Sequence, residues 1–264
     1  MGRSDVISRA LVALPLAIGA CLLVGVGGWW FVLGVTVIGF LCLHELFGLL
    51  DKDRPLRLAA FAAMVGVAVG AHAGGAPAVL GLSWAALLVA FLLVSLRADL
   101  SGATASISAT MLGVVWIVMA IGFAILLRDL NHGGAIVLDT LIATFAMDTG
   151  SYFAGRSFGR TPLAPRMSPK KTVEGLVGGV AAAIVAMLAA SLYQSWLGFE
   201  SALLIALVAA LLGPLGDLFE SVIKRDAGAK DASTVLGPHG GLLDRIDGVL
   251  FSIVGVYWLW SLIA

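Results

Sequence analysis

Charge is the scarcest property of this sequence. Asp, Glu, Lys and Arg make up 12% of its 264 residues, about half the share of a typical globular domain, which is about 25%. Mean hydropathy is +1.05, and apolar runs close to the roughly 20 residues needed to cross a bilayer recur along the chain. These features exclude a soluble globular domain. They predict an all-α, polytopic integral membrane protein, because open sheet edges cannot lie in lipid.

Cysteine and histidine are also rare, with 2 and 4 residues respectively. Cys21 and Cys42 both lie inside apolar runs, which excludes a disulfide framework and a cysteine-based metal site. His44, His72 and His132 are isolated from one another, and this argues against zinc. No Walker-type lysine motif and no Rossmann glycine pattern occur. Any nucleotide must therefore be held by a different scheme.

The apolar runs predict nine transmembrane helices in a single membrane domain covering 1–264. They lie near residues 10–26, 29–49, 58–72, 77–96, 106–127, 135–155, 173–192, 202–222 and 246–263. The first run also has features of a secretory signal, but we favour an uncleaved span because a second span follows almost at once. Residues 1–135 are expected to be structural and lipid-facing, and residues 136–264 to form the catalytic helices and cytoplasmic loops.

The basic residues are divided very unevenly between the two faces that nine spans create. Fifteen of the 16 Lys and Arg residues fall on one face, and only Arg128 falls on the other. Short cytoplasmic loops carry the excess of Lys and Arg, so the N-terminus is predicted to be cytoplasmic and the C-terminus outside. We therefore expect a multi-pass protein of the inner (plasma) membrane with its active site facing the cytoplasm.

Acidic residues inside or at the ends of the apolar runs are candidate site residues, because a charge in hydrocarbon is expensive. They are Glu45, Asp139, Asp148, Glu174, Asp217, Glu220 and Asp247. Glu45 could instead reach the interface or pair with a neighbouring base. Asp139 is expected to be structural.

The run near 202–222 contains Pro214 between two glycines, which predicts a kinked or broken helix beside a wet cavity. A packing kink is the alternative. Asp217, Glu220 and Lys224 follow at spacings of 3 and 4, so they share one helical face. If this span packs beside the last one, Asp217 can meet Asp244 near the cytoplasmic surface. Oxygen-rich sites of this kind suit a hard cation such as Mg²⁺.

A basic cluster, SPKKT, precedes the seventh predicted span. Ser168 and Pro169 resemble an N-cap and a first helical residue. Lys170, Lys171 and Thr172 would then open a helix, where backbone N–H groups and the helix dipole favour anions. Ordinary positive-inside charge is the alternative, although it explains the compactness of the cluster less well.

The polar block SVIKRDAGAKDASTVLGPHGGLLDRID occupies 221–247, and 8 of its 27 residues are Asp, Lys or Arg. Its glycines around His239 would let the backbone approach a ligand closely. Carboxylates ringed by basic groups suit polyphosphate chemistry, because Mg²⁺ binds through one or two carboxylates and the phosphates of a substrate.

These motifs resemble those of the phosphatidate cytidylyltransferases, also called CDP-diacylglycerol synthases. The 221–247 block matches the signature of that family without departure, and SPKKTVEG, DTGSYFAGR and GPLGDLFES resemble further family segments in the right order. The matched signature positions are Ser221, Lys224, Arg225, Lys230, Asp231, Ser233, Gly237, His239, Gly240, Gly241, Asp244, Arg245 and Asp247. The resemblance covers residues 148–247, whereas the N-terminal half is similar only in its hydrophobic spans.

The resemblance implies condensation of CTP with phosphatidic acid to give CDP-diacylglycerol and pyrophosphate. It implies a requirement for Mg²⁺, with room for a second cation, is compatible with a homodimer, and leaves no role for nucleic acid. A CTP-dependent polyprenol or lipid kinase is the nearest alternative function, and an ion-coupled transporter is a more distant one.

The resemblance and the charge pattern together give the candidate site residues. Asp217 and Asp244 would bind the metal. The catalytic set is Asp217, Asp244, Lys171, Lys224 and Arg245. The substrate-binding set is Asp148, Ser168, Lys170, Lys171, Thr172, Glu174, Lys224, Arg225, Lys230, Asp231, His239, Gly240, Gly241 and Asp247.

Overall fold

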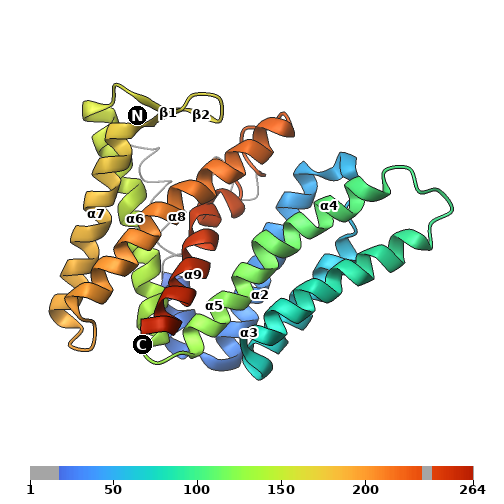
Figure 1. The fold of residues 1–264 in the computed structure, drawn as a ribbon, viewed down its shortest axis with the longest axis horizontal. Helices are drawn as coiled ribbons and strands as arrows, with labels where there is room; N and C mark the ends of the chain where they lie inside the picture. The colour runs from blue at the N-terminus through green and yellow to red at the C-terminus, as the bar shows by residue number, and fades with distance from the viewer. Residues whose placement is uncertain (1–17, 234–239, 264) are drawn as a thin grey trace.

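The protein, as a computed structural model, is described over residues 18–233 and 240–263, and this part is built almost entirely from helices (Figure 1). After a helical segment at 18–26 come α2 (Gly28–Leu49), a 3₁₀ turn (Asp51–Asp53), α3 (Arg57–Ser95), α4 (Ala103–Gly113), α5 (Met119–Asp129), α6 (Gly133–Phe158), α7 (Val173–Tyr193), α8 (Phe199–Asp226) and α9 (Leu243–Ile263). A π-helical turn, Val114–Val118, joins α4 to α5 without a break.

Six helices among the described residues are long and apolar enough to cross a membrane: α2, α3, the continuous 103–129 helix, α7, α8 and α9. This confirms the all-α membrane class. The predicted run at 10–26 lies only partly within the described residues. Helix α6, which carries Asp139 and Asp148, is not among the six.

Helix α3 contains both the third and the fourth predicted spans. Gly75 has φ 68° and ψ −161° and interrupts the helical backbone, a conformation that glycine adopts without steric penalty. A Cβ placed on Gly70 would lie 2.5 Å from Leu82 Cδ1. Residues 12 apart in a straight helix are about 18 Å apart, so the segments before and after Gly75 fold back against each other.

Figure 1 shows the helices in two groups, with α6 to α9 on one side and α2 to α5 on the other. Helix α9 packs against α8 and also against α5, which joins the two groups. A two-stranded antiparallel hairpin, β1 (Pro162–Ala164) and β2 (Ser168–Thr172), connects α6 to α7 at one end of the molecule. At this end Lys171 of β2 contacts Asp217 of α8.

Helix α8 is not broken at Pro214, so the break that was one form of the expectation is wrong. It runs as one helix from Phe199 to Asp226. The glycines around Pro214 act in packing: a Cβ on Gly216 would collide with the backbone oxygen of Asp247, and one on Gly248 would lie 2.9 Å from the backbone oxygen of Gly213. Small residues let membrane helices approach closely, so this segment serves as the contact surface between α8 and α9.

The predicted helix start at Ser168 and Pro169 is wrong. These residues lie in β2, and α7 begins at Val173 with Thr172 as its N-cap. The Thr172 hydroxyl accepts a hydrogen bond from the Gly175 backbone N–H at 3.1 Å, which satisfies one of the free amide groups of the first turn. A threonine cap four residues later therefore replaces the predicted serine cap.

Candidate active site

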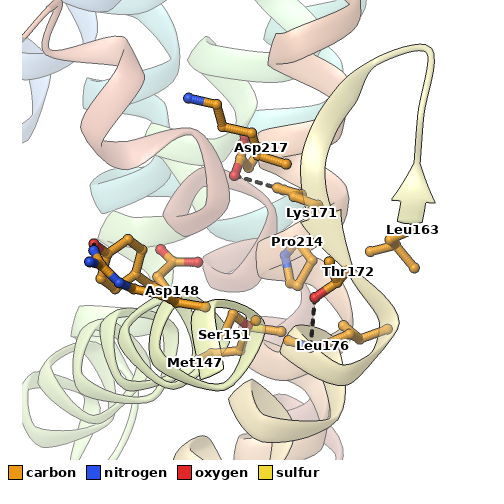
Figure 2. Close-up of a pocket in the computed structure, with 14 residues that line it drawn as sticks. Met147, Asp148, Ser151, Leu163, Lys171, Thr172, Leu176, Pro214 and Asp217 are labelled. Carbon is orange, nitrogen blue, oxygen red and sulfur yellow. Dashed lines mark hydrogen bonds and ion pairs between the residues drawn. The ribbon is translucent and has the colours of Figure 1, made fainter. Parts of the chain in front are cut away.

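A pocket of about 640 Å³ opens where α6, α7, α8 and the hairpin meet. Figure 2 shows Asp148 from α6, Lys171 and Thr172 from β2, and Pro214 and Asp217 from α8 around this pocket. Its wall combines these groups with apolar side chains such as Met147 and Leu176. A mixed polar and apolar pocket in a membrane protein suits a ligand with a charged head and an apolar body.

Lys171 forms an ion pair with Asp217, with 2.6 Å between Nζ and Oδ2 (Figure 2). The two side chains are 24% and 39% exposed, so water and a ligand can reach both. Asp148 lies within electrostatic range of both residues. The pair ties the hairpin to α8, although the two residues are 46 positions apart in the sequence.

The glutamate at position 174 holds the hairpin in place from the first turn of α7. Its carboxylate accepts hydrogen bonds from the backbone N–H of Arg160 at 3.0 Å and from the N–H and hydroxyl of Thr161 at 3.1 and 2.9 Å. Glu174 and Thr172, both predicted to bind substrate, are thus engaged in local structure. Their bonds fix the path of the chain that carries Lys171.

Lys224 bridges two helices beside this pocket. Its Nζ lies 2.6 Å from Glu220 Oε2 on α8 and 2.7 Å from Asp244 Oδ1 on α9. Glu220 is buried at 1% exposure, and the side chains of Lys224 and Asp244 are 13% and 11% exposed. Two carboxyl groups, one from each helix, thus share a single ammonium group at this depth.

Asp244 also binds the backbone on both sides of residues 234–239. Its carboxylate accepts hydrogen bonds from Ala232 N–H at 2.9 Å and from Gly241 N–H at 2.7 Å. Gly240 has φ +79°, and a Cβ there would lie 2.8 Å from Asp244 Oδ2. Glycine is therefore required at position 240, because the backbone there is left-handed and passes directly over the Asp244 carboxylate.

The three ion pairs of Lys171 and Lys224 belong to one group of acids. Asp247 on α9 is within electrostatic range of both Glu220 and Asp217. Glu220 and Asp247 also interact directly, through a hydrogen bond between their side chains. Asp148, Asp217, Glu220, Asp244 and Asp247 thus form one group of acids, which includes the partners of Lys171 and Lys224.

This donor set fits a hard cation. Within 18–233 and 240–263, no three His, Cys, Asp or Glu side chains are close enough together to enclose a metal ion. However, Asp217 and Asp244 each hold a lysine ammonium on a carboxylate oxygen, so each already binds a cationic group. Carboxylate oxygens without soft ligands are the kind of ligand that Mg²⁺ prefers.

The other predicted site residues differ in position and exposure. Lys170 lines the pocket with an exposed side chain, and Ser168 lies at the start of β2. Arg225, Lys230, Asp231 and Arg245 are exposed. Gly237 and His239 lie outside the described residues. The exposed basic groups are accessible to a ligand arriving from the aqueous side.

Glu45 on α2 is the residue near this site whose role the sequence did not reveal. It is 3% exposed and accepts hydrogen bonds from Ser233, Leu242 and Leu243. It neither reaches an interface nor pairs with a base in the part of the chain that is described. Its polar partners lie almost 200 residues further along the chain, so spacing carried no signal of this contact.

The fold and the site define a multi-pass membrane protein with a carboxylate- and lysine-lined centre suited to a metal and phosphates. Residues 7–263 match the model of the Cytidylyltransferase family, and the chain belongs to that family.

Several curated relatives carry the name phosphatidate cytidylyltransferase. The chain is 37% identical to one from Mycobacterium bovis over 161 residues, which cover 60% of this chain and 51% of the relative. It is 36% identical to one from Bacillus subtilis over 57% of each chain, and 35% identical to one from Thermotoga maritima over 55% of this chain and 56% of the relative. The chain thus spans about half the length of these relatives.

Proposed function

We propose that this protein condenses CTP with phosphatidic acid to give CDP-diacylglycerol and pyrophosphate, as a step of phospholipid biosynthesis. The observation that carries the proposal is the joint presence of the Lys171–Asp217 pair and the Glu220–Lys224–Asp244 bridge in a member of this family. The names of the relatives supply the choice of lipid substrate.

The reaction needs charge stabilisation more than proton transfer. A phosphate monoester has a second pKa of about 6, so the lipid phosphate is largely a dianion at neutral pH. One of its oxygens attacks the α-phosphorus of CTP and forms a new P–O bond. The bond from that phosphorus to the bridging oxygen breaks, and the electron pair leaves with pyrophosphate. No general base is required, but repulsion between the two anions must be overcome.

Lys171 is the best placed residue to neutralise a phosphate in the pocket. It lies at the pocket edge, and its partner Asp217 can release it to an incoming anion because both remain partly exposed. Lys224 is held more firmly by two carboxylates, so its task is to keep α8 and α9 in register. Lys170, Arg225, Lys230 and Arg245 supply further positive charge at the aqueous edge.

The bound metal would be Mg²⁺, held by Asp217 and Asp244. It would screen the charges of the two substrates and stabilise the charge that passes to pyrophosphate. A second cation would find the acids at Glu220 and Asp247 nearby.

The proposed setting is the inner membrane, crossed nine times, with the active site facing the cytoplasm, where CTP is found. The fifteen-to-one distribution of basic residues supports this orientation. The apolar side of the pocket would admit the lipid sideways from the bilayer. A homodimer is also compatible with this arrangement.

The direct test is product analysis. Purified protein is incubated with phosphatidic acid, Mg²⁺ and CTP labelled at the α-phosphate. The expected products are a labelled lipid that migrates as CDP-diacylglycerol and one pyrophosphate for each lipid formed. Labelled CDP without a labelled lipid would instead indicate a CTP-dependent lipid kinase.

A further inference from the structure

Glu45 lies in α2, in the half of the chain that contributes none of the site residues described above. Its side chain is almost completely buried, at 3% exposure. Oε1 accepts hydrogen bonds from the Ser233 hydroxyl at 2.7 Å and from Leu242 N–H at 2.9 Å. Oε2 accepts one from Leu243 N–H at 2.7 Å. Every one of these donors is a neutral hydroxyl or backbone amide.

The position of these donors makes Glu45 an external cap for α9. Leu243 is the first residue of that helix, and the first amides of a helix have no partner within it. A carboxylate at this end is favoured both by the amides and by the helix dipole. A residue of α2 therefore supplies the negative charge that a local capping residue usually provides.

Gly241 shows how closely the carboxylate approaches the chain. A Cβ at this position would lie 2.6 Å from Glu45 Oε2 and 2.9 Å from Glu45 Cδ. Gly241 itself is buried, and its N–H is used by Asp244. Gly241 thus makes room for the Glu45 carboxylate, whereas the backbone of Gly240 passes over Asp244.

Glu45 and Asp244 together hold the two chain segments that flank residues 234–239. Asp244 binds Ala232 and Gly241, and Glu45 binds the adjacent residues Ser233 and Leu242. The same bonds set the start of α9. They therefore set where Asp244 meets Lys224.

We propose that Glu45 is a positioning residue for the nucleotidyl transfer: it holds the start of α9 so that Asp244 and Lys224 are in place before substrates bind. This inference rests on the proposed function for its catalytic part. A purely structural role predicts less folded protein with normal turnover. A positioning role predicts folded protein with slow turnover.

The first test compares Glu45→Gln with Asp139→Asn, a matched change at a buried carboxylate in α6 that bonds Gln194. Glu45→Gln keeps the size of the side chain but turns an N–H₂ group toward one of the three donors, which loses one charged hydrogen bond. Hydrogen–deuterium exchange is measured at the amides of Leu242 and Leu243 in detergent-solubilised protein that elutes as a single species. We expect exchange there to be at least tenfold faster in Glu45→Gln and unchanged in Asp139→Asn.

Kinetics on the same preparations test the catalytic part. We expect kcat of Glu45→Gln to fall about a hundredfold, the size of effect that follows from misplacing a catalytic group by about 1 Å. The KM values for CTP and phosphatidic acid should change less than threefold, because Glu45 touches neither substrate. Asp139→Asn should retain normal kcat.

A double-mutant cycle tests the contact between Glu45 and Gly241 directly. Gly241→Ala alone should lower kcat, because the new Cβ displaces the Glu45 carboxylate. Glu45→Ala removes the obstacle, so adding Gly241→Ala to it should lower kcat by a much smaller factor. If Gly241→Ala lowered kcat by the same factor in the wild-type and the Glu45→Ala protein, the proposed contact between Gly241 and Glu45 would be contradicted.

The remaining outcomes also decide the matter. Faster exchange with normal kcat would overturn the positioning role, and slow turnover with unchanged exchange would overturn the hold on α9. If the wild-type protein forms no CDP-diacylglycerol at all, the proposed function fails and the catalytic part of this inference fails with it. Exchange at Leu242 and Leu243 then still shows whether Glu45 holds the helix.

Discussion

The Lys171 ammonium lies 2.6 Å from the Asp217 carboxylate and thereby joins the hairpin to the proposed metal-binding helix. Replacing Lys171 by Ala should lower kcat/KM about a hundredfold, because a charge directed at the reacting phosphates is lost. The measurement is turnover per molecule of membrane-inserted protein. Lys52→Ala, a change at an exposed base in the turn after α2, is the control. If both variants only reduced insertion, positive-inside charge would explain Lys171 fully.

Asp217→Asn and Asp244→Asn should each abolish measurable turnover over a full Mg²⁺ titration. Each change keeps the shape of the side chain and removes the charge that a hard cation requires. Asp226→Asn, at an exposed acid on the last turn of α8, should retain normal activity and the normal Mg²⁺ dependence. Near-normal activity of either test variant would remove that residue from the set of metal ligands.

Lys224→Met should destabilise the protein strongly. It leaves Glu220 and Asp244, both at most 11% exposed, without their shared cation. Removal of one partner of a buried ion pair costs about 3–5 kcal/mol in the free energy of unfolding, which denaturant unfolding in mixed micelles can measure. The neighbouring Arg225→Met change, at an exposed position, should alter stability by no more than about 0.5 kcal/mol. Similar values for both would mean that the bridge adds no stability.

Gly216→Ala should also destabilise the protein, although alanine favours a helix over glycine by about 1 kcal/mol. Its Cβ meets the backbone of Asp247, which cannot move aside without separating α8 from α9. Overpacking of this kind costs about 1–3 kcal/mol, so the steric effect exceeds the gain in propensity. Gly81→Ala in α3, where the new Cβ meets nothing within 4 Å, should be neutral or stabilising. A stable Gly216→Ala variant would contradict the close contact.

The predicted orientation can be tested by cysteine labelling in a chain whose Cys21 and Cys42 are replaced by Ala. Lys230→Cys and Asn131→Cys place thiols at two exposed positions on opposite predicted faces. An impermeant maleimide should label position 131 in intact cells and position 230 only in inverted vesicles. Labelling of position 230 from outside would reverse the orientation and remove the site from cytosolic CTP.

The sequence predicted the apolar helices well because their burial in lipid depends on local composition. The runs at 29–49, 173–192, 202–222 and 246–263 lie within α2, α7, α8 and α9 to within a few residues. The fold-back of α3 was also anticipated as two separate runs around Gly75. Nine crossings and the side on which each end lies remain predictions.

Features that depend on contacts across the chain were harder to predict. SPKKT was read as a helix start because Ser–Pro is a local cap pattern, whereas pairing with β1 makes it a strand. Pro214 was interpreted as a kink or a break, but α8 is continuous there and packs closely against α9. In both cases a tertiary contact overrides the local preference of the backbone.

The candidate site shows the same division. Motif residues such as Lys224 and Asp244 were identified individually. In the structure the Lys224 ammonium group links Asp244 to Glu220. Glu45 was ambiguous because a buried acid in a helix has the same sequence signal whether it faces lipid, a base or another helix.

The bond between Glu45 and Leu243 spans 198 positions of the sequence, and this has a consequence for biosynthesis. A ribosome adds roughly 5–20 residues per second, so Glu45 is made about 10–40 s before its partners emerge. During that time α2 must be in the membrane with a carboxylate that has none of its final donors. The translocon or the lipid headgroups must accommodate this charge meanwhile, and the centre is completed only when α9 arrives.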